Sequence, residues 1–266
     1  MPMKKPLLAL FERAALEAGE AIIAVCRAGA HVTLKSDCSP VTEADQRAED
    51  IILKHLRAAY PDIPIIAEEA VAAGDIPDTE GQPFFLVDPL DGTREFIAQS
   101  KEYTVNIALI EKGVPTAGIV YAPALGIAFT GAEGQAEKLR IDDDFKVVER
   151  SAIATRSCGN AVVAVMSRSH NSPETEAYLR EHGFSDTRSV GSSLKFCLLA
   201  EGDADVYPRF SRTMEWDTAA GDAVLRAAGG ITLGLDGKPL RYCKTRQPLD
   251  CAFANPHFIA WGRAPV

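Results

Sequence analysis

Residues 86–96 of this chain read Leu-Val-Asp-Pro-Leu-Asp-Gly-Thr-Arg-Glu-Phe, and this stretch decides how the chain is built. Its apolar beginning predicts the end of a buried strand, and two carboxylates, Asp88 and Asp91, follow it. Pro89 fixes one backbone angle and Gly92 permits conformations that other residues avoid. We therefore expect a bent, rigid segment that holds both carboxylates toward one cavity.

Two adjacent carboxylates repel each other, and an uncompensated pair is costly once it is removed from water. A hard divalent cation removes that cost. Mg²⁺ prefers carboxylate and carbonyl oxygen, keeps several waters, and often binds a substrate phosphate at the same time. The stretch therefore predicts metal-assisted phosphate chemistry.

Composition and charge narrow the class of protein. The 266 residues are enough for one α/β domain or two tightly packed halves. A formal net charge of −9 argues against nucleic-acid binding, which needs clustered Lys and Arg. No stretch approaches the roughly 18 apolar residues of a membrane-spanning helix. The six cysteines show no CxxC spacing, so we expect a reduced, cytoplasmic protein.

Hydrophobic periodicity outlines the secondary structure. It predicts helices over residues 5–28, 43–59, 173–181, 192–200 and 218–228. Apolar runs predict strands over residues 63–67, 84–87, 104–110, 116–121, 161–166 and 205–207. The third of these strands alternates apolar and polar residues, so we expect one of its faces to be less buried. Strands interleaved with helices predict a layered α/β or α+β architecture.

Residues 131–150 are polar and weakly periodic, and we place a boundary there. The N-terminal half, residues 1–150, would carry most of the metal ligands. The C-terminal half, residues 151–266, would carry Asp217 and the specificity residues. We expect the two halves to pack as one compact unit.

Three further segments place acidic residues at the ends of predicted strands or the starts of predicted helices. Glu68 and Glu69 follow an apolar strand, where a solvated strand end is the simpler explanation. Asp217 opens a helix of small residues, where capping explains it equally well. Those small residues would let the helix lie close against a neighbour. Asp45 stands three residues after Thr42, the spacing of a capping box, which accounts for it without any catalytic role.

Two blocks in the chain, residues 88–93 (DPLDGT) and residues 216–221 (WDTAAG), favour a functional interpretation. With Glu68-Glu69 upstream, they resemble the inositol monophosphatase superfamily. The resemblance spans about residues 35–255. It implies an α+β protein with the layered αβαβα sugar-phosphatase fold, and a lithium-sensitive phosphomonoesterase that depends on Mg²⁺.

Further segments resemble the 3′(2′),5′-bisphosphate nucleotidase branch of that superfamily. They are residues 102–107, 166–170, 190–197 and 207–210. This resemblance implies hydrolysis of adenosine 3′,5′-bisphosphate to AMP and phosphate. Inositol-specific members resemble one another in placing a Glu where this chain has Arg209. A guanidinium suits a second phosphate, because it can donate two parallel hydrogen bonds to it.

Other residues would contact the substrate. Lys195 follows Ser192 by one helical turn, so we expect both on one helix face. The hydroxyl groups of Ser192 and Ser193, at a helix N-terminus, suit an anion. His170 is a nucleotide contact by resemblance. The alternatives are a solvated surface pair for Lys195 and Arg209, and an ordinary loop histidine.

The resemblance also implies how these residues share the work. The ligands of two or three Mg²⁺ would be Glu68, Asp88, the Leu90 carbonyl, Asp91 and Asp217. Asp88 would bridge two ions about 4 Å apart. Asp45, acting through Thr93, would orient and deprotonate the attacking water, with Glu68 as its catalytic partner at the metal. Backbone N–H groups of Gly92 and Thr93 would cradle the phosphate, and Leu90 and Asp217 would complete the substrate contacts.

Rival interpretations remain at this point. The nearest is a phosphatase of the same fold that acts on inositol monophosphate or fructose 1,6-bisphosphate. A metal-dependent binding protein without catalysis is another. The apolar stripe of residues 7–25 would allow peripheral attachment to the cytoplasmic face of the inner membrane, although packing against the core explains it more simply. We expect a small nucleotide bisphosphate as partner, and a monomer or homodimer.

Overall fold

The computed structural model describes residues 4–29, 32–34, 40–157 and 161–263. The helices are α1 (Lys4–Ala28), α2 (Glu43–Ala59), α3 (Glu68–Ala72), α4 (Thr93–Ile97), the 3₁₀ turn η1 (Pro123–Leu125), α5 (Pro173–Glu181), α6 (Leu194–Ala200) and α7 (Glu215–Ala227). The strands are β1 (Val32–Leu34), β2 (Pro40–Thr42), β3 (Ile65–Ala67), β4 (Phe84–Asp91), β5 (Thr104–Glu111), β6 (Val114–Ala122), β7 (Ile127–Ala132), β8 (Gln135–Ile141), β9 (Val147–Ile153), β10 (Val163–Ser167), β11 (Asp186–Val190), β12 (Val206–Arg209), β13 (Ile231–Gly234) and β14 (Phe258–Trp261).

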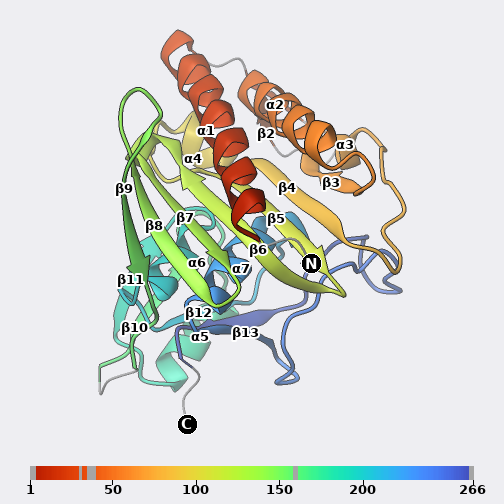
Figure 1. The fold of residues 1–266 in the computed structure, drawn as a ribbon. Coiled ribbons are helices and arrows are strands. Elements are labelled where there is room, and N and C mark those ends of the chain that lie inside the picture. Colours follow the sequence, from red (N-terminus) through yellow and green to blue (C-terminus); the bar gives the residue numbers. More distant parts are fainter. Residues whose placement is uncertain (1–3, 30–31, 35–39, 158–160, 264–266) are drawn as a thin grey trace.

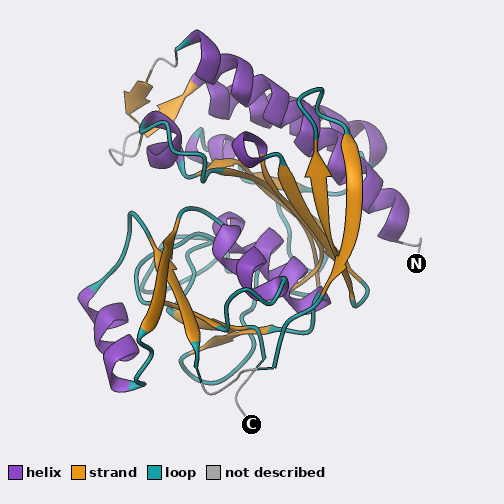
Figure 2. Ribbon diagram, turned by 90° about the vertical axis from the view of Figure 1, so that its left-hand side faces the viewer, coloured by secondary structure: helices purple, strands orange, loops and turns teal. Residues whose placement is uncertain are grey.

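These elements form five layers (Figure 1, Figure 2). Helices α1 and α2 cover one face of a seven-stranded sheet of order β3-β4-β5-β6-β7-β8-β9. Helices α6 and α7 lie between that sheet and a five-stranded sheet of order β11-β10-β12-β14-β13. Helix α5 covers the outer face of the second sheet. This αβαβα order confirms the layered α+β fold that the sequence predicts.

Helix α7 packs closely against its neighbours because small residues line its contacts. A Cβ added to Gly118 of β6 would stand 2.8 Å from the carbonyl oxygen of Ala220. On the other side, a Cβ added to Gly221 would stand 2.7 Å from the ring of Phe196 in α6. The prediction that small residues let this helix lie close against its neighbours is therefore confirmed. The close packing places Asp217 of α7 in the middle of the molecule.

The apolar stripe of helix α1 packs against the core. Leu7, Phe11 and Ile22 are buried, and the helix contacts β5, β6 and α2. The protein's own core occupies this face, which confirms packing as the explanation of the stripe and gives no support to a membrane anchor. Within the described ranges, none of the helices is both long and apolar enough to cross a membrane.

The polar region 131–150 differs from the prediction. It holds β8 and parts of β7 and β9, which extend the seven-stranded sheet in antiparallel fashion. The periodicity is weak because β9 is an edge strand that is mostly exposed, so no buried face alternates along it. The boundary expected at residue 150 falls inside β9, and the second sheet begins only at β10. The division into two halves stays a proposal.

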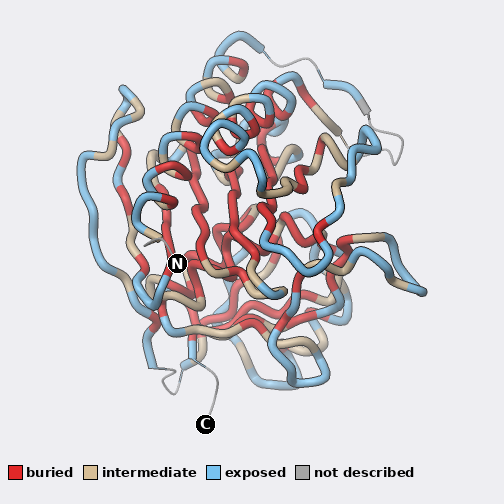
Figure 3. Tube along the Cα trace, turned by 45° about the vertical axis from the view of Figure 1, so that its right-hand side comes forward, coloured by how far each residue is buried: buried red, intermediate tan, exposed pale blue. Residues whose placement is uncertain are grey.

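Strand β5 also differs from the prediction of a less buried face. All of its residues through Ile110 are buried, because helices cover both sides of the sheet. Figure 3 shows this burial along the central strands, with exposure concentrated in loops and outer helical turns. Strands β11, β13 and β14 have no counterpart in the sequence prediction. Two cysteines, at positions 38 and 158, lie outside the described residues, and the four described ones are free.

Candidate active site

A cavity of about 750 Å³ opens where the ends of β4 and β12 meet the first turns of α3, α4, α6 and α7. Strand ends and helix starts leave backbone groups unpaired, so polar chemistry can gather there. Every expected metal or substrate residue lines this cavity: Glu68, Asp88, Leu90, Asp91, Gly92, Thr93, His170, Ser192, Ser193, Lys195, Arg209 and Asp217. Asp45 is the one expected site residue outside its lining, and it reaches the cavity through Thr93.

The end of β4 is bent by a β-bulge. Asp88 pairs with Asn106 of β5 and Asp91 pairs with Thr104, so β4 carries one extra residue between the two pairs. Pro89 stands inside this irregularity, where its missing N–H does not break the ladder. The Leu90 N–H donates to Asp88 Oδ1 at 3.0 Å. The bent segment that the sequence predicts is therefore confirmed.

Four carboxylates share this buried space, and we call Glu68, Asp88, Asp91 and Asp217 the acidic set. Burial raises the pKa of Asp88 well above its usual range, and the charges of the other three raise it further. Burial, followed by the charges of Asp91 and Glu68, raises the pKa of Asp217 to about 8. Burial also raises the pKa of Asp91, although Lys195 opposes it. Four ionised carboxylates would therefore repel one another strongly in this space.

This donor set fits a hard divalent cation. Carboxylate oxygens and the Leu90 carbonyl are the ligands that Mg²⁺ prefers, and a cation would relieve the repulsion that raises these pKa values. In the described ranges, no three acidic, histidine or cysteine side chains already converge on one coordination point. Their oxygens instead accept protein donors: Asp91 Oδ2 accepts from Ser193 at 2.8 Å, and Asp217 Oδ2 accepts from the Met214 N–H at 2.8 Å.

Asp45 serves both as a helix cap and as a partner of Thr93. Its Oδ2 accepts from the N–H and the hydroxyl of Thr42, at 2.7 and 2.8 Å, which confirms the capping box of α2. Its other oxygen, Oδ1, lies 3.3 Å from the Thr93 hydroxyl, which is also 3.3 Å from the Leu90 carbonyl oxygen. Burial raises the pKa of Asp45, and the charge of Glu68 adds to this. The cap and the Thr93 contact use different oxygens, so they do not compete.

Gly92 has a backbone conformation that requires glycine. Its φ of 94° is left-handed, and it is the N-cap of α4. A Cβ there would stand 3.3 Å from both the Glu102 carbonyl oxygen and a Glu95 carboxylate oxygen. The turn therefore presents backbone rather than a side chain to the cavity, as a phosphate cradle requires.

Three basic side chains that the sequence singles out line the same cavity, and we call His170, Lys195 and Arg209 the basic set. Lys195 Nζ donates to the carbonyl oxygens of Val190, at 3.3 Å, and Ser192, and its burial lowers its pKa to about 8. Arg209 donates to the carbonyl oxygens of Ser211, at 3.3 Å, and Arg212, at 3.0 Å. Both side chains are buried, so the alternative of a solvated surface pair is wrong.

Ser192 and Ser193 lie differently from the prediction. Helix α6 begins at Leu194, and Ser192 has a φ of 49°, so Ser192 and Lys195 do not share a helix face. Ser193 Oγ accepts from Asn106 at 2.8 Å and lies 2.8 Å from both Asp91 Oδ2 and the Asp217 carbonyl oxygen. Its hydroxyl therefore orients the acidic set and is not held free for a substrate anion.

His170 lies in the loop that follows β10. Its backbone N–H donates to Ser167 Oγ at 3.2 Å, and its carbonyl oxygen accepts from Ser211 Oγ at 2.8 Å. Burial lowers its pKa, and the positive charges of Arg209 and Arg94 lower it further. The imidazole is therefore held toward its neutral form.

The structure adds residues that sequence reasoning missed. Glu49 of α2 is buried, and its two carboxylate oxygens accept the N–H groups of Glu69 and Ala70, each at 2.8 Å. These bonds fix the turn that begins at Glu68, and burial raises the pKa of Glu49 to about 7. Its position four residues after Asp45 puts both on one helix face, which was the available signal.

Two more missed residues stand in the stretch 86–96 itself. Arg94 and Glu95 line the cavity, and the buried Glu95 carboxylate accepts from the hydroxyl of Ser169 in the loop after β10. Arg212, just before α7, lines the cavity as well. Arginine and glutamate are common on solvated surfaces, so their residue types alone gave no reason to select them.

A five-layer α+β fold with this acidic cavity defines a narrow class of protein. The chain belongs to the inositol monophosphatase family, whose model matches residues 3–257. It is 45% identical over 246 residues to the 3′(2′),5′-bisphosphate nucleotidase CysQ of Escherichia coli O157:H7, across 92% of this chain and 95% of that protein. Its identity to the protein of the same name from Salmonella typhimurium is 47% over 224 residues, across 84% and 86% of the two chains.

A solved structure supports the same relationship. The crystal structure of CysQ from Bacteroides thetaiotaomicron, a bacterial member of the inositol monophosphatase family, aligns with a TM-score of 0.79 and 35% identity. The alignment covers all of both chains. The resemblance seen in the sequence, to the family and to its nucleotidase branch, is confirmed.

Proposed function

We propose that this chain is an Mg²⁺-dependent 3′(2′),5′-bisphosphate nucleotidase that hydrolyses adenosine 3′,5′-bisphosphate to AMP and phosphate. One observation carries the proposal: the acidic set and the basic set line a single cavity. The acidic set suits metal-assisted removal of one phosphate, and the basic set suits a substrate with a second. Relatives with 45% and 47% identity are named as this nucleotidase, which supports the same substrate.

The acidic set and the Leu90 carbonyl would hold two or three Mg²⁺. When bound, these ions supply an activated water and stabilise the negative charge of the phosphate and of the departing 3′-oxygen. Asp88 is central to this arrangement, because its burial and the three neighbouring carboxylates give it the strongest need for a cation. Ser193 and the Met214 N–H would hold Asp91 and Asp217 in orientation for the ions.

Asp45 would act as the general base through Thr93. The Thr93 hydroxyl lies 3.3 Å from Asp45 Oδ1, so donating that proton leaves a lone pair of its oxygen for a proton of the attacking water. The raised pKa of Asp45 makes it a better proton acceptor at neutral pH than an ordinary aspartate. Glu68 contributes in two ways, as a ligand and as the nearby charge that raises this pKa.

Substrate contacts would divide between backbone and side chains. The Gly92 and Thr93 N–H groups would receive the phosphate that is removed. A guanidinium has five N–H donors, and the carbonyl contacts of Arg209 leave others for the second phosphate. Lys195 would offset the acidic set, and His170 and Ser192 would contact the nucleotide. We also propose a cytoplasmic location and a monomeric or homodimeric state.

The test is phosphate release by the purified chain with Mg²⁺ from three substrates: adenosine 3′,5′-bisphosphate, inositol 1-phosphate and fructose 1,6-bisphosphate. We expect the nucleotide to be hydrolysed with the highest kcat/KM, and LiCl to inhibit the reaction. An Asp91→Asn protein purified in the same way controls for contaminating phosphatases. A preference for either sugar phosphate would replace the nucleotidase assignment with a sugar phosphatase of the same fold, and no release from any substrate would contradict both.

A further inference from the structure

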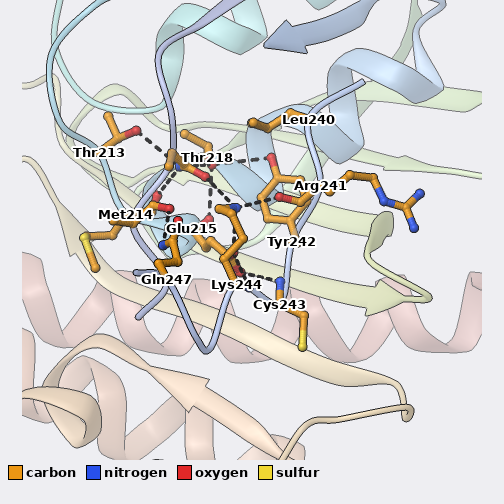
Figure 4. Close-up of polar contacts among 12 residues, drawn as sticks. Thr213, Met214, Glu215, Thr218, Leu240, Arg241, Tyr242, Cys243, Lys244 and Gln247 are labelled. Atoms are coloured by element: carbon orange, nitrogen blue, oxygen red, sulfur yellow. Dashed lines mark hydrogen bonds and ion pairs between the residues drawn. The ribbon is translucent and has the colours of Figure 1, made fainter. Parts of the chain in front are cut away.

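The acidic set contains one carboxylate, Asp217, that stands two residues from a second buried acid. Glu215 is fully buried at the start of α7. Its Oε2 accepts the Cys243 N–H at 2.7 Å, and its Oε1 accepts the Lys244 N–H at 2.8 Å (Figure 4). Lys244 Nζ completes the arrangement as an ion pair with Oε1 at 2.6 Å. Both carboxylate oxygens of Glu215 are therefore bound by one short segment. We call this segment, residues 241–255, the strap.

Asn255, at the end of the strap, binds the same first turn of α7. Its side-chain Nδ2 lies 2.7 Å from the Met214 carbonyl oxygen and 2.9 Å from Thr218 Oγ1. Lys244 Nζ donates to Asn255 Oδ1 at 3.2 Å, which joins the two halves of the arrangement. Backbone bonds add to it, because the Glu215 N–H donates to the Phe253 carbonyl oxygen at 2.8 Å.

Asp217 stands among carboxylates that repel it, so its orientation needs support from the protein. Asp91 and Glu68 repel it, and among the described residues its side chain accepts one hydrogen bond, from the Met214 N–H. Met214 is also the residue whose carbonyl oxygen Asn255 holds. Residues two apart on a helix point in different directions, so Glu215 can bind the strap while Asp217 faces the cavity.

We infer that the Glu215–Lys244 ion pair, joined to Asn255, is a positioning device that holds Asp217 in place as a metal ligand. The inference rests on the proposed metal-dependent function. Glu215 itself does not touch metal or substrate. It fixes the first turn of α7 against the strap, and the turn keeps Asp217 facing Asp91 and Glu68 despite their repulsion.

The experiment measures Mn²⁺ binding to the full chain by the loss of the free-ion EPR signal, alongside the Mg²⁺ dependence of hydrolysis and thermal unfolding. Asp217→Asn defines which binding step depends on Asp217. We expect Glu215→Gln and Lys244→Met to weaken that same step about tenfold, because residues that orient a metal ligand commonly change affinity by this much. Lys244→Arg keeps the ion pair and should restore most of the affinity.

Asp205→Asn is the matched control. Asp205 is also a buried carboxylate that accepts a backbone N–H, from Val163 at 2.8 Å, and pairs with an arginine, Arg156, at 2.6 Å. It lies outside the cavity lining, so its loss should lower the unfolding temperature and leave Mn²⁺ binding unchanged. This control separates a general loss of stability from a loss of positioning.

Lys244→Met keeps the two backbone bonds of Glu215, so it supplies a folded variant if Glu215→Gln does not fold. Wild-type Mn²⁺ affinity in Lys244→Met or Glu215→Gln, with a lowered unfolding temperature alone, would overturn the inference and leave the network a structural one. Failure of the proposed function is distinguishable: wild-type protein would then bind Mn²⁺ in the Asp217-dependent step without hydrolysing the nucleotide.

Discussion

The acidic and basic sets of the cavity differ in what their side chains contact. Each acidic side chain stands at the bulge of β4 or in the first turn of a helix, and the four repel one another. The basic side chains come from a loop, from within α6 and from the end of β12, and Lys195 and Arg209 are tied to backbone carbonyl oxygens. Lys195 and Arg209 therefore bind carbonyl oxygens within five residues of them in the chain, whereas the acidic side chains come from three separate elements and face one another. A bound cation would relieve the repulsion within the acidic set. Lys195 and Arg209 already have hydrogen-bond acceptors in the protein.

The largest effect should follow from breaking the acidic set. Asp91→Asn removes a metal ligand, and we expect turnover with Mg²⁺ to fall about 10⁴-fold, because metal ions supply several kcal/mol of transition-state stabilisation. The protein should remain folded, since the change also removes one repelling charge. Steady-state phosphate release and circular dichroism measure the two effects. Turnover within tenfold of wild type would refute the assignment of Asp91 as a ligand.

The next effect tests whether Asp45 works through Thr93 or only caps α2. We expect Asp45→Asn to lower kcat about a hundredfold to a thousandfold, as the loss of a general base does. Thr93→Val removes the linking hydroxyl and leaves the cap of α2 intact, and it should lower kcat to a similar degree. The pH profile of kcat is the measurement. Wild-type kcat in Thr93→Val would assign Asp45 to capping alone.

This contrast also explains how much the sequence predicts. Asp88, Asp91, Glu68 and Asp217 stand in short motifs, because a bulge or a helix start needs only a few neighbouring residues to form. The five-layer fold follows from the same motifs through family resemblance. Polar edge strands such as β9 are not predicted from the sequence, because a strand that buries neither face has no alternation of apolar and polar residues.

The basic set is less accessible to sequence reasoning. Lys195 looks like a helix-face partner of Ser192, and the positive φ of Ser192 that separates them depends on loop packing. Ser193 looks like an anion contact, and only the fold brings Asn106 and Asp91 to its hydroxyl. Glu49 of α2 accepts hydrogen bonds from backbone N–H groups of α3, about twenty residues further along the chain. Contacts of this kind join residues far apart in the chain, so no local pattern reports them.

A smaller effect should follow from reversing one charge of the basic set. Arg209→Glu should raise KM for adenosine 3′,5′-bisphosphate about 10- to 100-fold, because hydrogen bonds to charged groups contribute about 1.5–3 kcal/mol. KM for adenosine 3′-monophosphate should change much less, since it lacks the second phosphate. Arg209→Lys keeps the charge and controls for loss of the loop contacts. An equal change for both substrates would show that Arg209 does not bind the second phosphate.

The smallest effect concerns the free energy of unfolding without metal. Buried carboxyl groups and the buried Lys195 should change it with pH in opposite directions. Asp217, with a pKa of about 8, and Glu49, with a pKa of about 7, keep protons in the folded chain that they lose when it unfolds. Their contribution is fully present below about pH 4 and is lost as pH rises through 7 and 8. Lys195 acts in the other direction, because its folded pKa of about 8 lies below its unfolded value. It costs stability below pH 8, and that cost disappears above it.

In EDTA, the free energy of unfolding should therefore fall between pH 5 and 8 and level off or rise toward pH 9.5. Urea titrations at half-unit steps measure this curve. Saturating Mg²⁺ should remove the part of the falling limb that comes from Asp217, because the bound cation keeps that carboxylate ionised in the folded state, and should leave the part that comes from Glu49. Asp217→Asn should flatten the falling limb, and Lys195→Met should flatten the part above pH 8. A curve in EDTA that rises steadily from pH 5 to 8 would mean that burial and mutual repulsion do not raise the pKa values of the acidic set, and the contrast between the two sets would fail at its physical basis.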